Sequence, residues 1–203
     1  MIPDTLQNNQ ASFRIMRSTL IGLPSPSALR SNIFPGVRIG FDPIIGNYCI
    51  IFGNVFIGNQ FRCGDNVLIR DNTSIGDEVT IGDWSFIDTD VVVADGVSIG
   101  DDVWIPRTTR IGRNVVIGSN VRLLTDLPMT PHANGGRYGG IILEDGCTIG
   151  KNAVIGPGVC VSSGACVEAG AVVTGDITLD AHLVKNTMLF MAPCVNERIN
   201  PVV

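Results

Sequence analysis

An aliphatic residue occupies every sixth position through most of this chain, and a glycine usually follows it. The track keeps its phase from Ile39 to Leu123, with one cysteine (Cys63) among its aliphatic members, and it resumes from Leu143 to Val173. An amphipathic α-helix repeats its apolar positions about every 3.6 residues, and a half-buried strand about every 2. A period of six fits neither and is the signature of a parallel β-helix. We therefore expect an all-β fold.

Three six-residue sides close one triangular turn, so one rung of the β-helix takes 18 residues. The repeat then predicts about five rungs before a loop at residues 124–140 and about two rungs after it, about seven in all. We expect the β-helix to span residues 33–178 as one main domain. Residues 1–32 leave the pattern and are expected to form an N-terminal cap or strap, and residues 179–203 a C-terminal tail, because a solenoid needs caps at its ends.

One edge of the expected prism differs from the other two. Side chains replace the glycine after the aliphatic residue at six positions spaced by 18, which are Phe34, Phe52, Arg70, Asp88, Pro106 and Leu124. We expect the same edge to continue after the loop as Glu144 and Ser162. A different turn type on this edge is one interpretation. The other is that the edge lines a site, because Arg70–Asp71 and Asp88–Thr89 are polar and the loop begins there too. A long insertion in a compact repeat is commonly functional.

Composition excludes several classes of function. The net charge of −5 argues against a nucleic-acid surface, which would be basic. No apolar run approaches the roughly 20 residues of a membrane span, and the N-terminus does not read as a signal peptide. The hydrophobic fraction of 45% with only 16% charged residues is high, so we expect flat faces to be buried against copies of the same chain. Trp84 and Trp104 lie outside the inward columns and suggest such an interface or, alternatively, stacking on a base or sugar.

Six cysteines are present without a CxxC pair. Their positions predict mostly buried, reduced thiols, and hence a cytoplasmic protein with no metal site.

The repeats resemble those of the hexapeptide-repeat acyltransferases. The similarity covers about residues 36–178 and is carried by NVLIRDNTSIGDEVTIG, VWIPRTTRIGRNVVIGSNVRLLTD, DGCTIGKNAVIGPGV and GACVEAGAVVTGDI. This series is most similar to the sugar N-acetyltransferases that use acetyl-CoA on nucleotide-linked amino sugars. The resemblance implies a left-handed parallel β-helix and a homotrimer with active sites between subunits. It also implies acetyl-CoA as co-substrate and a nucleotide-sugar acceptor, with neither nucleic acid nor membrane as a partner.

The resemblance also implies site residues. His132 lies in the loop where related enzymes place a base, and a histidine titrates in the range that a base needs. Asp126, at the root of the loop, would orient or deprotonate the acceptor amine, or alternatively hold the loop entry as a turn residue. Thr125 stands where relatives have the asparagine that contacts the amine. The glycine-asparagine-proline-alanine-arginine segment usual near the C-terminus of relatives is absent.

Arg70, Asp71 and Asp88 are candidates for binding the sugar or its phosphates, with an Arg70–Asp71 surface ion pair as the alternative. The rungs along which relatives lay the pantetheine arm supply the cofactor-binding candidates Lys151, Ala153, Gly156, Ala169, Gly170 and Thr174.

Three other functions remain open. An O-acetyltransferase acting on a sugar hydroxyl would need the same donor and a stronger base. A zinc carbonic anhydrase on this fold would need three histidine ligands per metal, and the chain has two histidines. A non-enzymatic β-helix scaffold would need neither the loop nor the marked edge.

Overall fold

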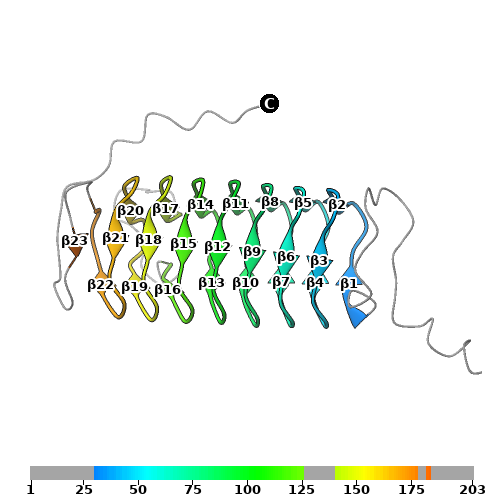
Figure 1. Ribbon diagram of the computed structural model, residues 1–203, viewed down its shortest axis with the longest axis horizontal. Coiled ribbons are helices and arrows are strands. Elements are labelled where there is room, and N and C mark those ends of the chain that lie inside the picture. The colour runs from blue at the N-terminus through cyan, green and yellow to red at the C-terminus, as the bar shows by residue number, and fades with distance from the viewer. Residues whose placement is uncertain (1–29, 126–139, 178–181, 184–203) are drawn as a thin grey trace, which may run out of the picture.

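The computed structural model describes residues 30–125 and 140–177, together with the short strand His182–Leu183. Within these ranges the chain is a parallel β-solenoid of about seven turns (Figure 1), built from two-residue strands. The predicted all-β fold class is confirmed. Residues 1–29 of the predicted 1–32 cap and most of the predicted 179–203 tail lie outside the described residues, and Asn32 at the end of the predicted cap already belongs to the first strand of the coil. One part of that tail, His182–Leu183, pairs with the coil as a strand.

The strands form three parallel sheets, one on each side of a triangular prism, in which every strand pairs with strands one rung away. Sheet A contains β1 (Asn32–Ile33), β4 (Ile50–Ile51), β7 (Leu68–Ile69), β10 (Phe86–Ile87), β13 (Trp104–Ile105), β16 (Arg122–Leu123), β19 (Val154–Ile155) and β22 (Val172–Val173). Sheet B contains β2 (Arg38–Ile39), β5 (Phe56–Ile57), β8 (Ser74–Ile75), β11 (Val92–Val93), β14 (Arg110–Ile111), β17 (Ile142–Leu143) and β20 (Cys160–Val161). Sheet C contains β3 (Ile44–Ile45), β6 (Arg62–Cys63), β9 (Thr80–Ile81), β12 (Ser98–Ile99), β15 (Val116–Ile117), β18 (Thr148–Ile149), β21 (Cys166–Val167) and β23 (His182–Leu183).

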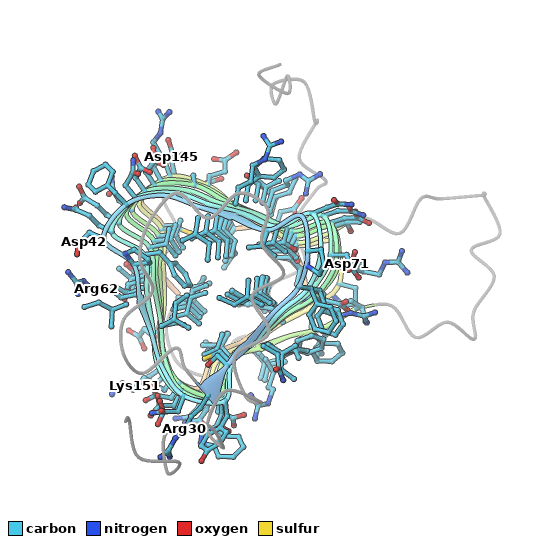
Figure 2. The ribbon with its side chains drawn as sticks, turned by 90° about the vertical axis from the view of Figure 1, so that its right-hand side faces the viewer. Arg30, Asp42, Arg62, Asp71, Asp145 and Lys151 are labelled. Atoms are coloured by element: carbon cyan, nitrogen blue, oxygen red, sulfur yellow. The ribbon has the colours of Figure 1, made fainter. Side chains whose placement is uncertain are left out.

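The coil is left-handed, as the resemblance implied. Figure 2 looks along the axis from the N-terminal end, where β1 is nearest the viewer. The chain leaves the corner of Arg30, passes the corner that carries Asp71, and then reaches the corner of Asp42. It therefore turns anticlockwise while it recedes, which is the left-handed sense.

The core consists of the predicted columns. In the strands whose side chains are described, the second residue points inward and is buried, while the first is exposed or half-buried, except in β20, where Cys160 is buried as well. Small or apolar residues two positions before the track residues complete the filling, and Cys49, Val97 and Cys147 are all fully buried. Close packing of aliphatic side chains between stacked rungs is the main source of stability in such a core.

Each corner takes three residues, and crowding explains why the first is usually glycine on two of the edges. On the C–A edge, between sheets C and A, the Asp65 backbone N–H donates to Asp83 Oδ1 one rung further on, at 2.8 Å. The same contact repeats along this edge and along the B–C edge. A side chain on Gly64 would overlap the Asp83 carboxylate. The first corner glycine thus makes room for this carboxylate ladder. On the B–C edge this first corner position is alanine once, at Ala94, and there the next rung carries Arg113 in place of an aspartate.

The third corner residue takes a positive φ on every edge. Non-glycine residues there have φ between 50° and 61°, and they include Trp84 on the C–A edge and Thr108 on the A–B edge. The φ of this residue therefore does not distinguish the marked edge from the other two. The difference lies in the side chains that the marked edge carries.

The marked edge is the A–B edge, between sheets A and B, and the chain leaves the coil for the loop and re-enters it at this edge, as expected. Leu124 follows β16 of sheet A, and the chain re-enters the coil at β17 of sheet B. The expectation that the edge continues as Glu144 and Ser162 is wrong, because the loop replaces one corner and both residues follow strands of sheet B. The A–B edge continues instead at Gly156 and Thr174.

Candidate functional site

The A–B edge gathers charged and polar side chains on consecutive rungs. Arg70 Nη1 lies 3.6 Å from Asp88 Oδ1, and the two side chains are 45% and 17% exposed. The ion pair joins residues one rung apart rather than the chain neighbours Arg70 and Asp71. Its partial exposure leaves the guanidinium accessible to an anionic ligand.

Hydrogen bonds to its carboxylate and to its backbone carbonyl hold Asp88 in place. The Thr89 backbone N–H donates to Asp88 Oδ1 at 2.7 Å, and the Thr73 hydroxyl donates to the Asp88 carbonyl at 3.0 Å. The Thr89 hydroxyl donates to the Asp71 carbonyl at 2.9 Å. Asp88 is therefore fixed from two rungs, and it positions the Arg70 guanidinium in turn. The Asp71 side chain lies on the same corner, half-buried (Figure 2).

Arg107 is a further cation on this edge that the sequence candidates omitted. It lies one rung beyond Asp88, its side chain is exposed, and none of the ion pairs within residues 30–125 and 140–177 involves it. The sequence could have indicated Arg107, because it directly follows Pro106 and has the same position in its rung as Asp71 and Thr89. The A–B edge thus carries two guanidinium groups, those of Arg70 and Arg107.

The point where the chain leaves the coil for the loop lies beyond Arg107 on the same edge. Thr125 is exposed and leaves the coil two rungs beyond Asp88, which corresponds to about 10 Å at the usual strand spacing. Gly140 returns against Thr108, and a Cβ on Gly140 would overlap the Thr108 carbonyl oxygen. Both ends of the loop therefore meet the A–B edge. Asp126 and His132 lie outside the described residues, so their roles stay predictions.

The predicted cofactor residues divide between two edges. Gly156 and Thr174 are on the A–B edge, whereas Lys151, Ala169 and Gly170 are on the C–A edge, at the opposite border of sheet A. Figure 2 shows Lys151 at a corner away from Asp71. The outward side chains of β19 and β22, Val154 and Val172, lie between the two groups. A ligand touching both would cross the outer face of sheet A in the last rungs.

The predicted cofactor-binding residues differ in the solvent exposure of their side chains. Ala153 is fully buried in the core column, so its side chain is not available to a ligand. Lys151, Ala169, Gly170 and Thr174 are exposed, and a Cβ on Gly170 would meet nothing within 4 Å. An extended arm could therefore lie close to the coil at Gly170.

The outer face of sheet A also carries an apolar stripe beside the site. Its outward residues include Ile50, Leu68, Phe86 and Trp104, and the last two rings stack with centroids 6.3 Å apart. Trp104 is 39% exposed, and the Arg122 side chain in the next rung is paired with Asp102 at 2.7 Å. The stripe is thus followed by Arg122, whose charge is neutralised by Asp102, and it borders the A–B edge directly. Trp84 lies on the C–A edge and is 68% exposed.

Among the described residues there is no group of three or more histidine, cysteine, aspartate or glutamate side chains arranged to bind a metal ion. The same part of the chain contains no helix long and apolar enough to cross a membrane.

No protein-family model and no curated protein matches the chain. Among solved structures it is similar to a UDP-N-acetylglucosamine acyltransferase from Campylobacter jejuni, with 19% identity and a TM-score of 0.43 over 76% of this chain and 68% of that one. It is also similar to AntD, an N-acyltransferase from Bacillus cereus solved as a variant with dTDP and coenzyme A, with 18% identity and a TM-score of 0.27 over 79% and 74% of the two chains. The polySia-specific acetyltransferase NeuO gives 18% identity and a TM-score of 0.29 over 86% and 80%. At these values, the function has to rest on this chain's own residues.

Proposed function

We propose that the chain transfers an acetyl group from acetyl-CoA to the amino group of a nucleotide-linked amino sugar, by direct attack in a ternary complex. The observation that carries the proposal is that the loop leaves and re-enters the coil at the edge where ionic side chains replace glycine. The sequence resemblance to acyltransferases of this repeat class supplies the reaction type.

The described residues suit the binding of a nucleotide sugar. A diphosphate carries negative charge, and a guanidinium is the side chain best shaped to bind phosphate oxygens. Arg70, held by Asp88, and the exposed Arg107 offer this chemistry two rungs apart on the A–B edge. The sugar would then reach toward Thr125 and the loop. Asp71 is a second acceptor group for sugar hydroxyls.

The chemistry requires a neutral amine, a group that takes its proton, and a donor to the oxyanion of the tetrahedral intermediate. We assign the proton transfer to His132 and the orientation of the amine to Asp126. Attack of the amine on the thioester carbonyl expels the CoA thiolate, so no covalent enzyme intermediate is needed. The enzyme's main contribution is to hold the two substrates in line.

Acetyl-CoA is proposed as the donor, lying against the last rungs on the side of sheet A. The small exposed residues Ala169, Gly170 and Thr174 would allow close approach of the pantetheine arm, and Lys151 would meet a phosphate.

We also propose a homotrimer that works in the cytoplasm. The apolar stripe of sheet A supports the assembly, since exposed apolar surface beside a site is a common subunit contact. Cys49, Cys63, Cys147 and Cys166 form no disulfide in the described part of the chain, which supports a reducing compartment.

The test is acyl transfer with acetyl-CoA against a panel of UDP- and dTDP-amino sugars, followed by thiol release and product mass. A product one acetyl group heavier that survives mild alkaline treatment supports N-acetylation. A product that loses the acetyl group under that treatment supports O-acetylation instead. No product with any acceptor, together with no thermal stabilisation by CoA, refutes the proposal and favours a scaffold.

A further inference from the structure

Two thiols meet inside the second rung of the coil. Cys49 Sγ lies 3.9 Å from Cys63 Sγ across the C–A edge. Cys49 comes immediately before β4, which begins this rung, and Cys63 ends β6, which completes it. The pair therefore joins the start of one turn of the solenoid to its end.

The pair is the exception among the described cysteines. Cys147 is also buried but has no sulfur partner among the described residues, and Cys166 points outward from sheet C and is exposed. Cys63 replaces an aliphatic residue in a column where Ile45 and Ile81 flank it. A valine or isoleucine would fill this place, so packing alone does not call for a thiol.

The surroundings prepare Cys49 to react first. The hydrogen bond between the Cys49 and Cys63 thiols, with smaller help from Val67 and Ser31, lowers the pKa of Cys49 from 9.0 to about 7 against the effect of burial. The same contact, together with burial, raises the pKa of Cys63. Thiol exchange proceeds through the thiolate, so one member of the pair is the better nucleophile and the other the later partner.

Access to the pair comes from the end of the coil. Only the rung β1–β3 stacks on its N-terminal side within the described residues. The terminal repeats of a solenoid contact a neighbour on one side only, and such units open locally at lower free energy than central ones.

We propose that Cys49 and Cys63 are a redox-active pair that forms a disulfide with a small disulfide such as oxidised glutathione. The Cys49 thiolate attacks one glutathione sulfur, the glutathione S–S bond breaks, and a glutathione thiolate leaves. Cys63 then gives up its proton to solvent and attacks the Cys49 sulfur, releasing the second glutathione. Two protein thiols are oxidised and one glutathione disulfide is reduced to two thiols.

The bond would close one complete turn of the solenoid covalently. The sulfurs have to approach by roughly 2 Å, to the usual bond length of about 2.05 Å. The closed rung could no longer unwind from the N-terminal end. This inference stands independently of the proposed acetyl transfer.

The experiment incubates the reduced, folded protein with oxidised glutathione at pH 7.5, quenches it with acid, and alkylates the remaining thiols after denaturation. Peptide mass mapping should find Cys49 linked to Cys63, Cys147 alkylated, and the exposed Cys166 carrying glutathione. Hydrogen exchange of residues 50–63 should slow by at least about tenfold in the oxidised protein, because the loop is closed.

Two conservative variants identify the order of events. Cys63→Val, the residue type of Val167 in the same column, should leave glutathione trapped on Cys49. Cys49→Ser, the residue type of Ser31 and Ser85 in its column, should leave Cys63 reduced. Circular dichroism checks that both variants fold, and Cys147→Ala is the control that leaves the crosslink intact.

Full alkylation of both Cys49 and Cys63 in the wild-type protein, while Cys166 carries glutathione, would overturn the proposal. That result shows an active oxidant and an unreactive pair. A wild-type crosslink of Cys49 to any other cysteine would overturn it equally.

Discussion

The contact between Gly64 and the Asp83 carboxylate provides a quantitative test of the corner ladder. A Cβ at Gly64 would overlap Asp83 Oδ1, but it would lie 3.0 Å from the Asp83 backbone nitrogen. The obstacle is therefore mainly a side chain that can be removed. At Gly46, by contrast, the added Cβ would overlap the backbone carbonyl of Gly64, which no side-chain substitution removes.

The magnitudes follow from these contacts. Asp83→Ala removes the hydrogen bond from the Asp65 N–H and should cost about 1 kcal/mol. Gly64→Ala must displace the same carboxylate and add steric strain, for a total of about 2–3 kcal/mol. In the Asp83→Ala background the new methyl group meets only the backbone nitrogen of residue 83, at 3.0 Å, a close contact that a shift of a few tenths of an ångström relieves. Gly64→Ala should then cost less than about 1 kcal/mol, because alanine also restricts the unfolded chain.

The assay is a double-mutant cycle measured by urea unfolding at 25 °C under reducing conditions, with circular dichroism as the signal. We expect a coupling free energy of about 1.5 kcal/mol between positions 64 and 83, well above the additivity error of about 0.5 kcal/mol. The matched cycle of Gly46→Ala with Asp65→Ala should show little coupling, since the backbone clash remains. An additive cycle at 64 and 83, or equal coupling in both cycles, would show that the ladder does not explain the glycines.

Three further predictions concern the site and its surroundings. Arg70→Ala should raise the acceptor KM about tenfold with a smaller effect on kcat, because a phosphate contact is lost. The control is Arg113→Ala, which breaks an ion pair on the B–C edge and should leave both kinetic constants unchanged. Burial raises the pKa of Cys147 from 9.0 to about 12, so the folded protein keeps the thiol proton at a pH where the unfolded chain has lost it. The free energy of unfolding therefore has its full contribution from this thiol below pH 9 and loses that contribution as the pH rises toward 12. The wild type should therefore lose about 1.4 kcal/mol per pH unit more than Cys147→Val over that window in urea titrations, and parallel losses would contradict the assignment. Trp104→Glu on sheet A should reduce the molar mass measured by light scattering, while Val116→Glu on sheet C should not, and unchanged mass for both would exclude the sheet A stripe as the subunit contact.

The fold could be predicted from sequence because its signal is repeated at every turn. A residue such as Ile69 is one of many in phase, so a single exception such as Cys63 does not alter the pattern. The phase beyond the loop could not be predicted. All three sides present the same aliphatic pattern, so the sequence does not reveal whether a loop replaces one corner or more. Glu144 and Ser162 were misplaced for this reason.

The candidate site was predicted in part. The 18-residue spacing correctly placed Arg70 and Asp88 on one edge with the loop, and the same spacing also specifies their ion pair across rungs. The contact of Cys49 with Cys63 is different, because a separation of 14 residues belongs to neither the six-residue nor the 18-residue period. It arises from two side chains that enter the core from opposite sides of one corner. Only the three-dimensional arrangement reveals it.

The stacking of rungs along the A–B edge has a consequence for evolution. The distance between the Arg70–Asp88 pair and the root of the loop is fixed by a whole number of rungs, each contributing about 4.8 Å. Insertion or deletion of 18 residues between Asp88 and Leu124 would preserve every column and hydrogen-bonded ladder while changing that distance by one step. The distance between the ion pair and the root of the loop can therefore change only in steps of one rung, and the length of a ligand that spans the two would change in the same steps.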